Sequence, residues 1–459
     1  MKNRLFGVIL FVVAFVPRFL VSARLHPEPV WDGHYYDFGA RRIAEGMGYS
    51  DSVAIAGASV WHPWCHYPVG YSAFLGFFYK VFGTGAMVAQ LVNTTVGALV
   101  VLFTWLLAQH ALSEKRAKLA GVIAALHPGL ILYSALTMTE PLATLATLVA
   151  FWLGVRDPKP TRGALFAAIV LGISALVRPT VLLVAPFLAF VAIPRGKAAT
   201  RIAWAAVLSV ATLLPVLPWT ARNCRVMDGC ALVSTNAGWN LAIGAFPRAT
   251  GRFETLRSSD GCREVTGQVQ QDRCWFNYGV DQIKSDPIRW LSLAPKKLAF
   301  TFDHESFAVE YLHEANPTWW SDSRRTLARD ATTLAHRLLV CAAVFGCVAF
   351  RVGRNRGAKP QAALFGILIL GAALCLRENM VWPLVIVASI LPWLPLPGSP
   401  EFTPAMKLSV ILLGTTALTH AIFFGEDRYH LVTTPALILL AAGALRRPAA
   451  ATILPPART

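Results

Sequence analysis

The sequence predicts an all-α polytopic membrane protein. Its 459 residues are 55% hydrophobic and 15% charged, with a mean hydropathy of +0.51, whereas soluble domains carry about a quarter charged residues. Apolar stretches of about 20 residues, each long enough to cross a hydrocarbon core about 30 Å thick, recur from end to end. Backbone groups in lipid must pair within their own segment, so these stretches are expected to be helices.

About 12 transmembrane helices follow from these stretches. They are expected at residues 5–23, 86–111, 119–136, 141–155, 164–178, 180–193, 202–219, 331–350, 361–376, 379–396, 407–424 and 430–445. Residues 21–23 resemble a signal-peptide cleavage site, but the length of the first stretch favours its retention. The chain then divides into an N-terminal transmembrane catalytic core (1–219), an extracytoplasmic segment (220–330) and C-terminal transmembrane helices (331–459).

The net charge of +17 is explained by topology. With the N-terminus inside, basic residues cluster in the cytoplasmic connections and at the ends: Lys2, Arg4, Lys115, Arg116, Lys118, Arg156, Lys159, Arg162, Arg195, Lys197, Arg201, Arg351, Arg354, Arg356, Lys359, Arg446 and Arg447. Only the acids Glu114, Asp157 and Glu401 share these connections. This positive-inside pattern predicts a plasma-membrane protein and no nucleic-acid partner.

Two long segments are expected outside, at 24–85 and 220–330. The first contains Asp32 and a short interfacial helix from Ala40 to Gly48. The second contains four of the eight cysteines, for which Cys224–Cys230 and Cys262–Cys274 are local pairings among three alternatives. Cys65 is left over, and Cys341, Cys347 and Cys375 are expected to pack within spans.

No Walker loop, GxGxxG turn or Asp-x-Asp pair offers to hold a nucleotide. A site that faces outward has no soluble activated nucleotide at hand, so a donor must arrive within the membrane. A sugar linked to a polyprenyl phosphate meets this need, because it brings its own leaving group. The enzyme then requires one base for the acceptor hydroxyl and cations for the phosphate.

Two acids are candidates for catalysis. Asp32 directly follows the first span, where donor and acceptor meet; alternatively it is a solvated loop residue or a helix cap. Glu140 lies in the outer turn Thr139-Glu140-Pro141, where it either assists or stabilises the start of a helix. Asp37 is expected to be a cap or a surface charge.

Cations for a phosphate are expected on the outer side. The candidates are Arg18, Arg178, Arg222, Lys296, Lys297, Arg377 and Arg428, of which Arg222 and Arg428 lie in dense polar clusters; snorkelling is the alternative, and it suits the two lysines best. Tyrosines and tryptophans of the outer loops either stack on a sugar or form an interfacial belt. Histidines 34, 62 and 66 match no ligand pattern around Asp32, so no cofactor is required and a divalent metal stays open.

Several short motifs occur in a consistent order. They are Asp32-x-x-Tyr35-Tyr36, Gly46-x-Gly48-Tyr49, Tyr67-Pro68-x-Gly70-Tyr71, Thr139-Glu140-Pro141-Leu142, Arg178-Pro179-Thr180, Pro218-Trp219-Thr220-x-Arg222-Asn223, Ser234-Thr235-Asn236-Ala237-Gly238-x-Asn240-Leu241-x-Ile243-Gly244, Ala249-Thr250-Gly251 and Arg428-Tyr429. With them the chain resembles the GT-C superfamily of polyprenyl-phosphate-sugar-dependent glycosyltransferases, which includes protein O-mannosyltransferases and the lipid A aminoarabinose transferase.

The resemblance implies roles for particular residues. Asp32 corresponds to the catalytic acid-base residue and Glu140 to an assisting acid. Substrate binding is expected of Tyr35, Tyr36, Tyr67, Tyr71, Arg178, Arg222, Asn223, Asn240, Arg428 and Tyr429. Gly33 departs from the pattern, because many members carry a second acid there; Val69 and Ala237 replace a frequent proline and glycine.

The sequence thus predicts an inverting glycosyltransferase whose site faces the extracytoplasmic side. Its partners would be membrane lipids, a polyprenyl-phosphate-linked sugar and an acceptor that is an envelope lipid, a polysaccharide or a protein. Two alternatives stay open. One is a polymerase or ligase of lipid-linked oligosaccharides, and the other is a secondary transporter, although no internal repeat supports it.

Overall fold

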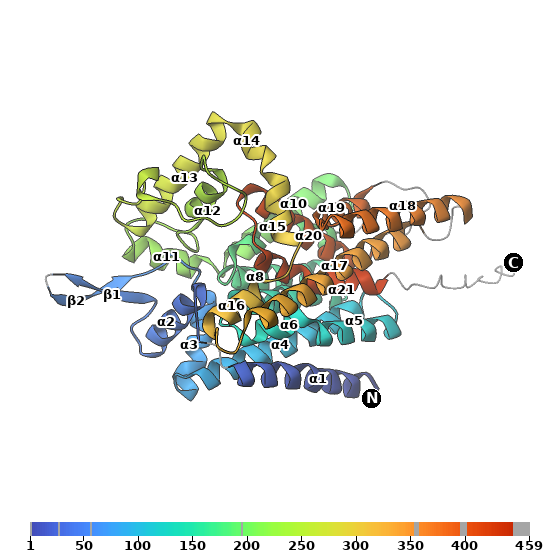
Figure 1. Cartoon of the computed structure of the whole chain (residues 1–459), viewed down its shortest axis with the longest axis horizontal. Helices are drawn as coiled ribbons and strands as arrows, with labels where there is room; N and C mark the ends of the chain where they lie inside the picture. Colours follow the sequence, from blue (N-terminus) through green and yellow to red (C-terminus); the bar gives the residue numbers. More distant parts are fainter. Residues whose placement is uncertain are drawn as a thin grey trace.

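The computed structural model describes residues 2–25, 28–55, 57–193, 196–352, 358–394 and 402–443. It is 75% helix and 3% strand, which confirms the predicted helical class. Figure 1 shows the long helices lying roughly along one direction, with a lobe of shorter helices and a hairpin at one end. The predicted topological charges Arg195, Arg354, Arg356, Glu401, Arg446 and Arg447 lie outside the described residues.

The N-terminal half forms ten α-helices and one hairpin. The helices are α1 (Lys2–Leu25), α2 (Asp32–Ala44), α3 (Gly70–Phe82), α4 (Ala86–Ala108), α5 (Glu114–Leu126), α6 (Pro128–Leu132), α7 (Thr139–Arg156), α8 (Pro160–Ala175), α9 (Ala189–Ala192) and α10 (Ala198–Leu213), with 3-10 helices η1 (Tyr133–Ala135) and η2 (Pro179–Leu188). Strands β1 (Ser50–Ile55) and β2 (Ala58–Pro63) pair antiparallel in the register Ser50↔Pro63 to Ile55↔Ala58.

The C-terminal half adds eleven α-helices among the described residues. They are α11 (Leu217–Val226), α12 (Ala237–Ala245), α13 (Gln268–Ser285), α14 (Pro287–Ser292), α15 (Ala294–Phe302), α16 (Phe307–Ala315), α17 (Asp322–Val352), α18 (Ala358–Arg377), α19 (Trp382–Ile390), α20 (Pro404–Ile422) and α21 (Thr434–Gly443), with 3-10 helices η3 (Ser258–Asp260), η4 (Leu391–Trp393) and η5 (Asp427–Thr433).

Four helices are long and apolar enough to cross a membrane: Asn3–Leu25, Ala86–Ala108, Asp322–Ala349 and Pro404–Ile422. Two bent pairs, Glu114–Leu126 with Pro128–Ala135 and Ala198–Leu213 with Leu217–Val226, pass the same test together, which gives up to six spans among the described residues. The predicted number of twelve is therefore not confirmed. The other apolar stretches form shorter helices, in part because prolines such as Pro186 interrupt them.

The helices pack through small residues. Helix α1 packs on α4, α4 on α7, α7 on α8, and α8 on α10, while α21 packs on α5 and α17. On α8, Ala164, Ala167 and Ala168 are fully buried. At Gly172 a Cβ would lie 2.1 Å from the carbonyl oxygen of Thr212 in α10. Such residues let helix backbones approach closely, which is typical of helix packing within membranes.

The predicted interfacial helix at Ala40–Gly48 is longer and lies earlier in the chain. Helix α2 begins at Asp32 and ends at Ala44, because Gly46 and Gly48 adopt positive φ values of 84° and 70°. The hairpin that follows was not predicted from the sequence. Its turn contains Gly57, which also has a positive φ of 80°.

The two long segments that were predicted to share one side of the membrane contact each other at one end of the bundle (Figure 1). The amide of Thr235 donates to the carbonyl of Cys65 at 2.9 Å, and Gln268 accepts from the amide of Cys65 at 3.0 Å. Both predicted disulfides, Cys224–Cys230 and Cys262–Cys274, are present. Cys65 is a free, buried thiol, as expected.

Candidate active site

The start of α2 places Asp32 at a helix N-terminus. Trp31, the residue before it, adopts a positive φ of 49°, a strained conformation for a bulky side chain. Its ring is held against Phe307 and Tyr311, with centroid distances of 5.5 and 5.9 Å. Asp32 therefore enters the first turn in a fixed direction, where the helix dipole favours its charged form.

Gly33 has no room for a side chain. A Cβ there would lie 2.2 Å from the hydroxyl oxygen of Tyr311 and 2.9 Å from the carbonyl oxygen of Thr137. Tyr311 is fully buried, and its hydroxyl accepts a hydrogen bond from the amide of Val30 at 3.1 Å. The space that a second acid at this position would need is therefore filled by Tyr311.

Two side chains hold the carboxylate of Asp32. The hydroxyl of Tyr67 donates to Oδ1 at 2.7 Å, and Nη1 of Arg428 donates to Oδ2 at 2.5 Å. Burial acts to raise the pKa of Asp32, but the charge and hydrogen bond of Arg428, together with Tyr67 and His66, outweigh it and hold the pKa below its usual value. Burial, and then the charge of Asp32, raise the pKa of Tyr67, so its hydroxyl stays a donor.

Arg428 is the centre of the cluster. It lies on η5, where its Nε pairs with Glu426 and its guanidinium stacks over the rings of Phe307 and Tyr429 at 5.1 and 5.0 Å. Burial raises the pKa of Glu426 to about 7, although Arg428 acts to lower it. One arginine therefore serves two carboxylates, of which Glu426 is the one that takes up a proton near neutral pH.

A second ion pair lies on the other face of Tyr429's neighbourhood. Nη1 of Arg178 donates to Oε1 of Glu140 at 2.8 Å, and their side chains are only 10% and 1% exposed. The guanidinium of Arg178 also stacks on Tyr429, at 4.9 Å from the ring centroid. Tyr429 therefore contacts both arginines and links the Asp32 pair to the Glu140 pair. Glu140 is a buried ion-pair partner as well as a first-turn residue of α7.

The predicted tyrosines form a row beside Asp32. The rings of Tyr35 and Tyr36 both lie 5.4 Å from that of Tyr67, and Tyr36 lies 5.7 Å from Tyr71. Tyr36 and Tyr71 are buried, and the hydroxyl of Tyr71 donates to Asn93 at 2.8 Å. Tyr35 is 46% exposed, so it and Tyr67 present the surface that can meet a ligand.

Three predicted binding residues have other contacts. Arg222 donates to the carbonyls of Trp64 and Tyr49 at 3.0 and 2.7 Å, which ties α11 to the segment around the hairpin. Asn223 is fully buried and donates to the carbonyls of Ala231 and Val233. Asn240 is half-buried on α12. These contacts organise the lobe and do not reach the Asp32 carboxylate.

Several expectations for charged residues need correction. Arg18 is fully buried and donates to three backbone carbonyls, of Ala14, Ala124 and Ala125, because a buried guanidinium takes the acceptors within its reach. Lys297 does not snorkel: its side chain is buried and donates to the carbonyl of Ile422 at 2.9 Å. Arg377 is 80% exposed beside Glu378.

The acid and the histidines of the first outer segment also differ from expectation. Asp37 is buried and accepts from Tyr79 at 2.5 Å and from Arg41 at 2.6 Å, because both donors reach it from neighbouring turns. His62 pairs with Asp51 at 2.7 Å on the hairpin. His66 packs against Tyr67, and His34 against Tyr35. The three histidines therefore do not gather around Asp32.

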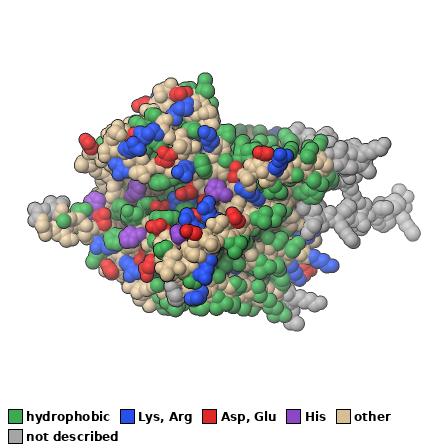
Figure 2. All heavy atoms as spheres, viewed as in Figure 1, with side chains coloured by type: hydrophobic (Ala, Val, Ile, Leu, Met, Phe, Trp, Pro, Cys, Tyr) green, Lys and Arg blue, Asp and Glu red, His purple; other side chains and the backbone are tan. Residues whose placement is uncertain are grey.

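Sequence reasoning missed Glu426 and Phe307 as parts of the site. Glu426 stands in the same short polar run as Arg428, so the density of charge at the end of a span was a usable signal. A cavity of about 390 Å³ borders Glu426 and Asp427 and is lined on its other side by Arg325 and Arg329. Figure 2 shows basic, acidic and histidine side chains gathered over the middle of this face.

Comparison with known proteins follows from this geometry. Residues 66–219, about a third of the chain, match the profile of the family described as dolichyl-phosphate-mannose-protein mannosyltransferase. The resemblance to polyprenyl-phosphate-sugar-dependent glycosyltransferases that the motifs predict is thereby confirmed. The matched segment includes Tyr67, Glu140 and Arg178; Asp32 and Arg428 lie outside it. No curated protein matches the chain.

Two solved structures share this arrangement of the chain at low identity. The oligosaccharyltransferase AglB from Archaeoglobus fulgidus, in complex with an inhibitory peptide and a dolichol-phosphate, has 13% identity and a TM-score of 0.41, over 96% of this chain and 50% of its own. ArnT from Cupriavidus metallidurans, bound to undecaprenyl phosphate, has 12% identity and a TM-score of 0.38, over 96% and 77%. The chain thus spans half the length of AglB.

Proposed function

We propose that the protein is an integral membrane glycosyltransferase that moves a sugar from a polyprenyl-phosphate donor to an acceptor hydroxyl, with inversion. The observation that carries this proposal is the cluster itself: a charged carboxylate at a helix N-terminus, Asp32, lies 2.5 Å from Arg428, and a second arginine, Arg178, shares the ring of Tyr429. One base beside two cations is the minimum that transfer from a phosphate-linked sugar requires.

In the proposed reaction Asp32 accepts the proton of the acceptor hydroxyl while that oxygen attacks the anomeric carbon. The bond between this carbon and the phosphate oxygen breaks, and the electron pair leaves with the polyprenyl phosphate. The guanidinium groups of Arg428 and Arg178 stabilise the charge that develops on the phosphate. Tyr35 and Tyr67 offer aromatic surface next to the carboxylate, on which a sugar face can stack.

Donor binding is proposed to release the base. Before binding, Arg428 pairs with Asp32 and Arg178 pairs with Glu140, at 2.5 and 2.8 Å. A phosphate that enters between the arginines competes with these carboxylates for the same donors. As Arg428 turns to the phosphate, Asp32 loses the partner that lowers its pKa and becomes a better proton acceptor.

Glu426 keeps the local charge balanced in this scheme. Three carboxylates, on Asp32, Glu140 and Glu426, face two arginines, so an added phosphate makes the site more negative. Because its pKa is raised to about 7, Glu426 can take up a proton when the phosphate enters. We further propose that this cluster faces the extracytoplasmic side, as the positive-inside pattern favours, and that the chain crosses the membrane twelve times.

The test of function is product analysis. Envelope lipids, polysaccharides and glycoproteins from cells that lack the protein are compared by mass spectrometry with those from cells that express the wild type, Asp32→Asn or the control Asp51→Asn, which changes an acid paired with His62 on the hairpin. We expect one hexose or pentose mass to be lost without the protein and with Asp32→Asn only. Loss of a whole oligosaccharide would favour a polymerase or ligase, and unchanged products would contradict the proposal.

A further inference from the structure

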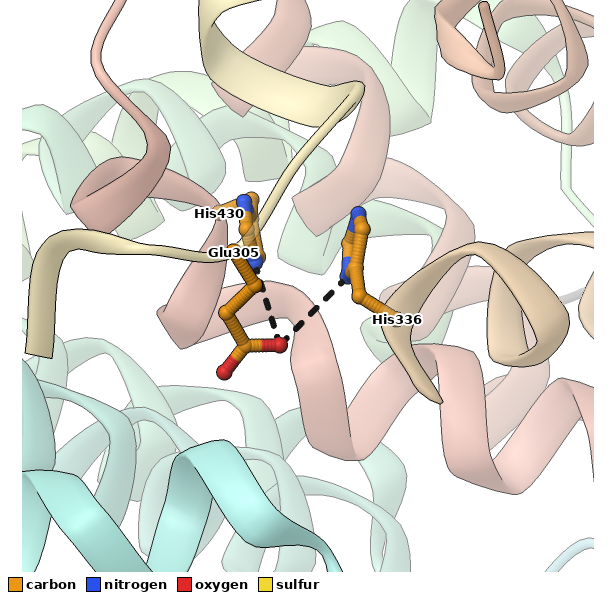
Figure 3. Close-up of side chains that lie close together, drawn as sticks. All are labelled: Glu305, His336 and His430. Carbon is orange, nitrogen blue, oxygen red and sulfur yellow. Dashed lines mark ion pairs between the residues drawn. The ribbon is translucent and has the colours of Figure 1, made fainter. Parts of the chain in front are cut away.

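A compact group of buried side chains lies below η5 and outside the cluster described above. Glu305 comes from the loop between α15 and α16, His336 from the middle of α17 and His430 from η5, two residues beyond Arg428. One ligand atom from each residue lies within 4.8 Å of the other two, and all three side chains are at least 97% buried. Figure 3 shows both rings approaching the same carboxylate.

Backbone carbonyls fix how the two rings face Glu305. A carbonyl oxygen only accepts, so Nε2 of His336 donates to Phe302 at 2.8 Å and Nδ1 of His430 donates to Thr301 at 2.7 Å. In the neutral rings, the remaining nitrogens then carry lone pairs. These atoms, Nδ1 of His336 and Nε2 of His430, lie 3.8 and 3.7 Å from Oε2 of Glu305. Three acceptors therefore face one another.

No protein donor relieves this conflict within the described residues. Both oxygens of Glu305 and the facing nitrogens of His336 and His430 are buried without a hydrogen-bond partner. Protonated rings do not resolve it, because 3.7–3.8 Å exceeds the hydrogen-bond range. The rings also stack at 3.9 Å, where two positive charges would repel. A water molecule has only two hydrogens for three acceptors.

We propose that Glu305, His336 and His430 bind a divalent transition-metal ion, with zinc the best fit. Two imidazoles and one carboxylate form a common zinc ligand set. Ligands at about 2.0–2.2 Å in a tetrahedron lie about 3.4 Å apart, a few tenths of an ångström less than the separations to Glu305. The hydrogen bonds to Phe302 and Thr301 are the outer contacts that orient metal-binding histidines and fix their tautomers.

The surroundings hold Glu305 in place. The carbonyl of Glu305 accepts from Thr332, and Asp427 accepts from the amides of Ser306 and Phe307 in the next residues of the loop. The carboxylate lies directly on Gly129, where a Cβ would be 1.4 Å from Oε1. A ligand set on such fixed elements is preorganised for a metal. The ion would join α17, the 303–306 loop and η5, and so position Arg428.

Metal analysis of the full-length protein tests the site. The protein, without an affinity tag, is purified in detergent as wild type, Glu305→Gln, His336→Gln, His430→Gln and the control His313→Gln, whose ring contacts the carbonyl of Trp320 outside the group. We expect close to one equivalent of zinc by mass spectrometry in the wild type and the control. We expect at least a tenfold loss in the three site variants.

Spectroscopy keeps the proposal testable if a variant does not fold. The wild type is stripped with a chelator and reconstituted with Co²⁺, whose visible bands report its coordination, and the zinc form is examined by X-ray absorption. We expect nitrogen and oxygen ligands with two imidazoles. Absence of metal in the wild type together with no Co²⁺ uptake, a sulfur-containing shell, or full zinc in Glu305→Gln and His336→Gln would each overturn the proposal. These readouts do not depend on sugar transfer.

Discussion

Replacing Gly33 by alanine tests how closely Asp32 is positioned. Alanine is favoured over glycine in a helix by up to about 1 kcal/mol. Its Cβ, however, would lie 2.2 Å from Oη of Tyr311 and 2.9 Å from the carbonyl oxygen of Thr137, neither of which is the end of a flexible side chain. Overpacking of this kind costs about 1–3 kcal/mol. We therefore expect a net loss of stability of about 1–2 kcal/mol.

The same displacement should reduce sugar transfer. A catalytic group moved by about 1 Å loses about 100-fold in rate. Stability is measured by thermal unfolding in detergent and transfer by single-turnover assay. Adding Tyr311→Phe removes the nearest atom and should recover part of both losses. The control Gly85→Ala, which meets no atom within 4 Å, should change neither. A Gly33→Ala protein as stable and active as the wild type would refute the reasoning.

Three further predictions concern the charges around the site. Glu140→Gln leaves Arg178 buried and unpaired, so stability should fall by about 3 kcal/mol, and a further Arg178→Met change should restore part of it; additive losses would argue against the pair. Because the pKa of Asp32 is held low, the wild type should lose transfer only below the ordinary range of an aspartate, and Tyr67→Phe should move this acid limb to higher pH; an unmoved limb would exclude Asp32 as the titrating base. Glu426→Gln, which mimics the protonated form of a group with a pKa of about 7, should bind donor at pH 8 more tightly than the wild type does; equal or weaker binding would count against its role.

The sequence located much of the site because its members flank apolar segments. Asp32, Glu140, Arg178 and Arg428 all stand where a helix starts or ends, and such polar residues at one end of a bundle must lie near one another. The helical class and both disulfides were likewise predictable, the former from composition and the latter from short spacing.

Other features depend on tertiary contacts that no local pattern reveals. Arg18 and Arg222 look like phosphate ligands in the sequence, yet each satisfies backbone carbonyls. Tyr311 fills the space beside Gly33 from a distant helix. The group of Glu305, His336 and His430 comes from three separate segments without ligand spacing. The number of spans was overestimated because apolar composition does not show where prolines shorten a helix.

The most direct test of the central claim compares donor binding and sugar transfer in Asp32→Asn. Asparagine keeps the size of the side chain and removes the base. The purified variant is given the polyprenyl-phosphate sugar that product analysis identifies, and bound donor and transferred sugar are measured in the same sample. We predict that donor binding is retained while the single-turnover rate falls by about 100-fold or more, the usual contribution of a general base. Transfer within a few-fold of the wild-type rate would contradict the account.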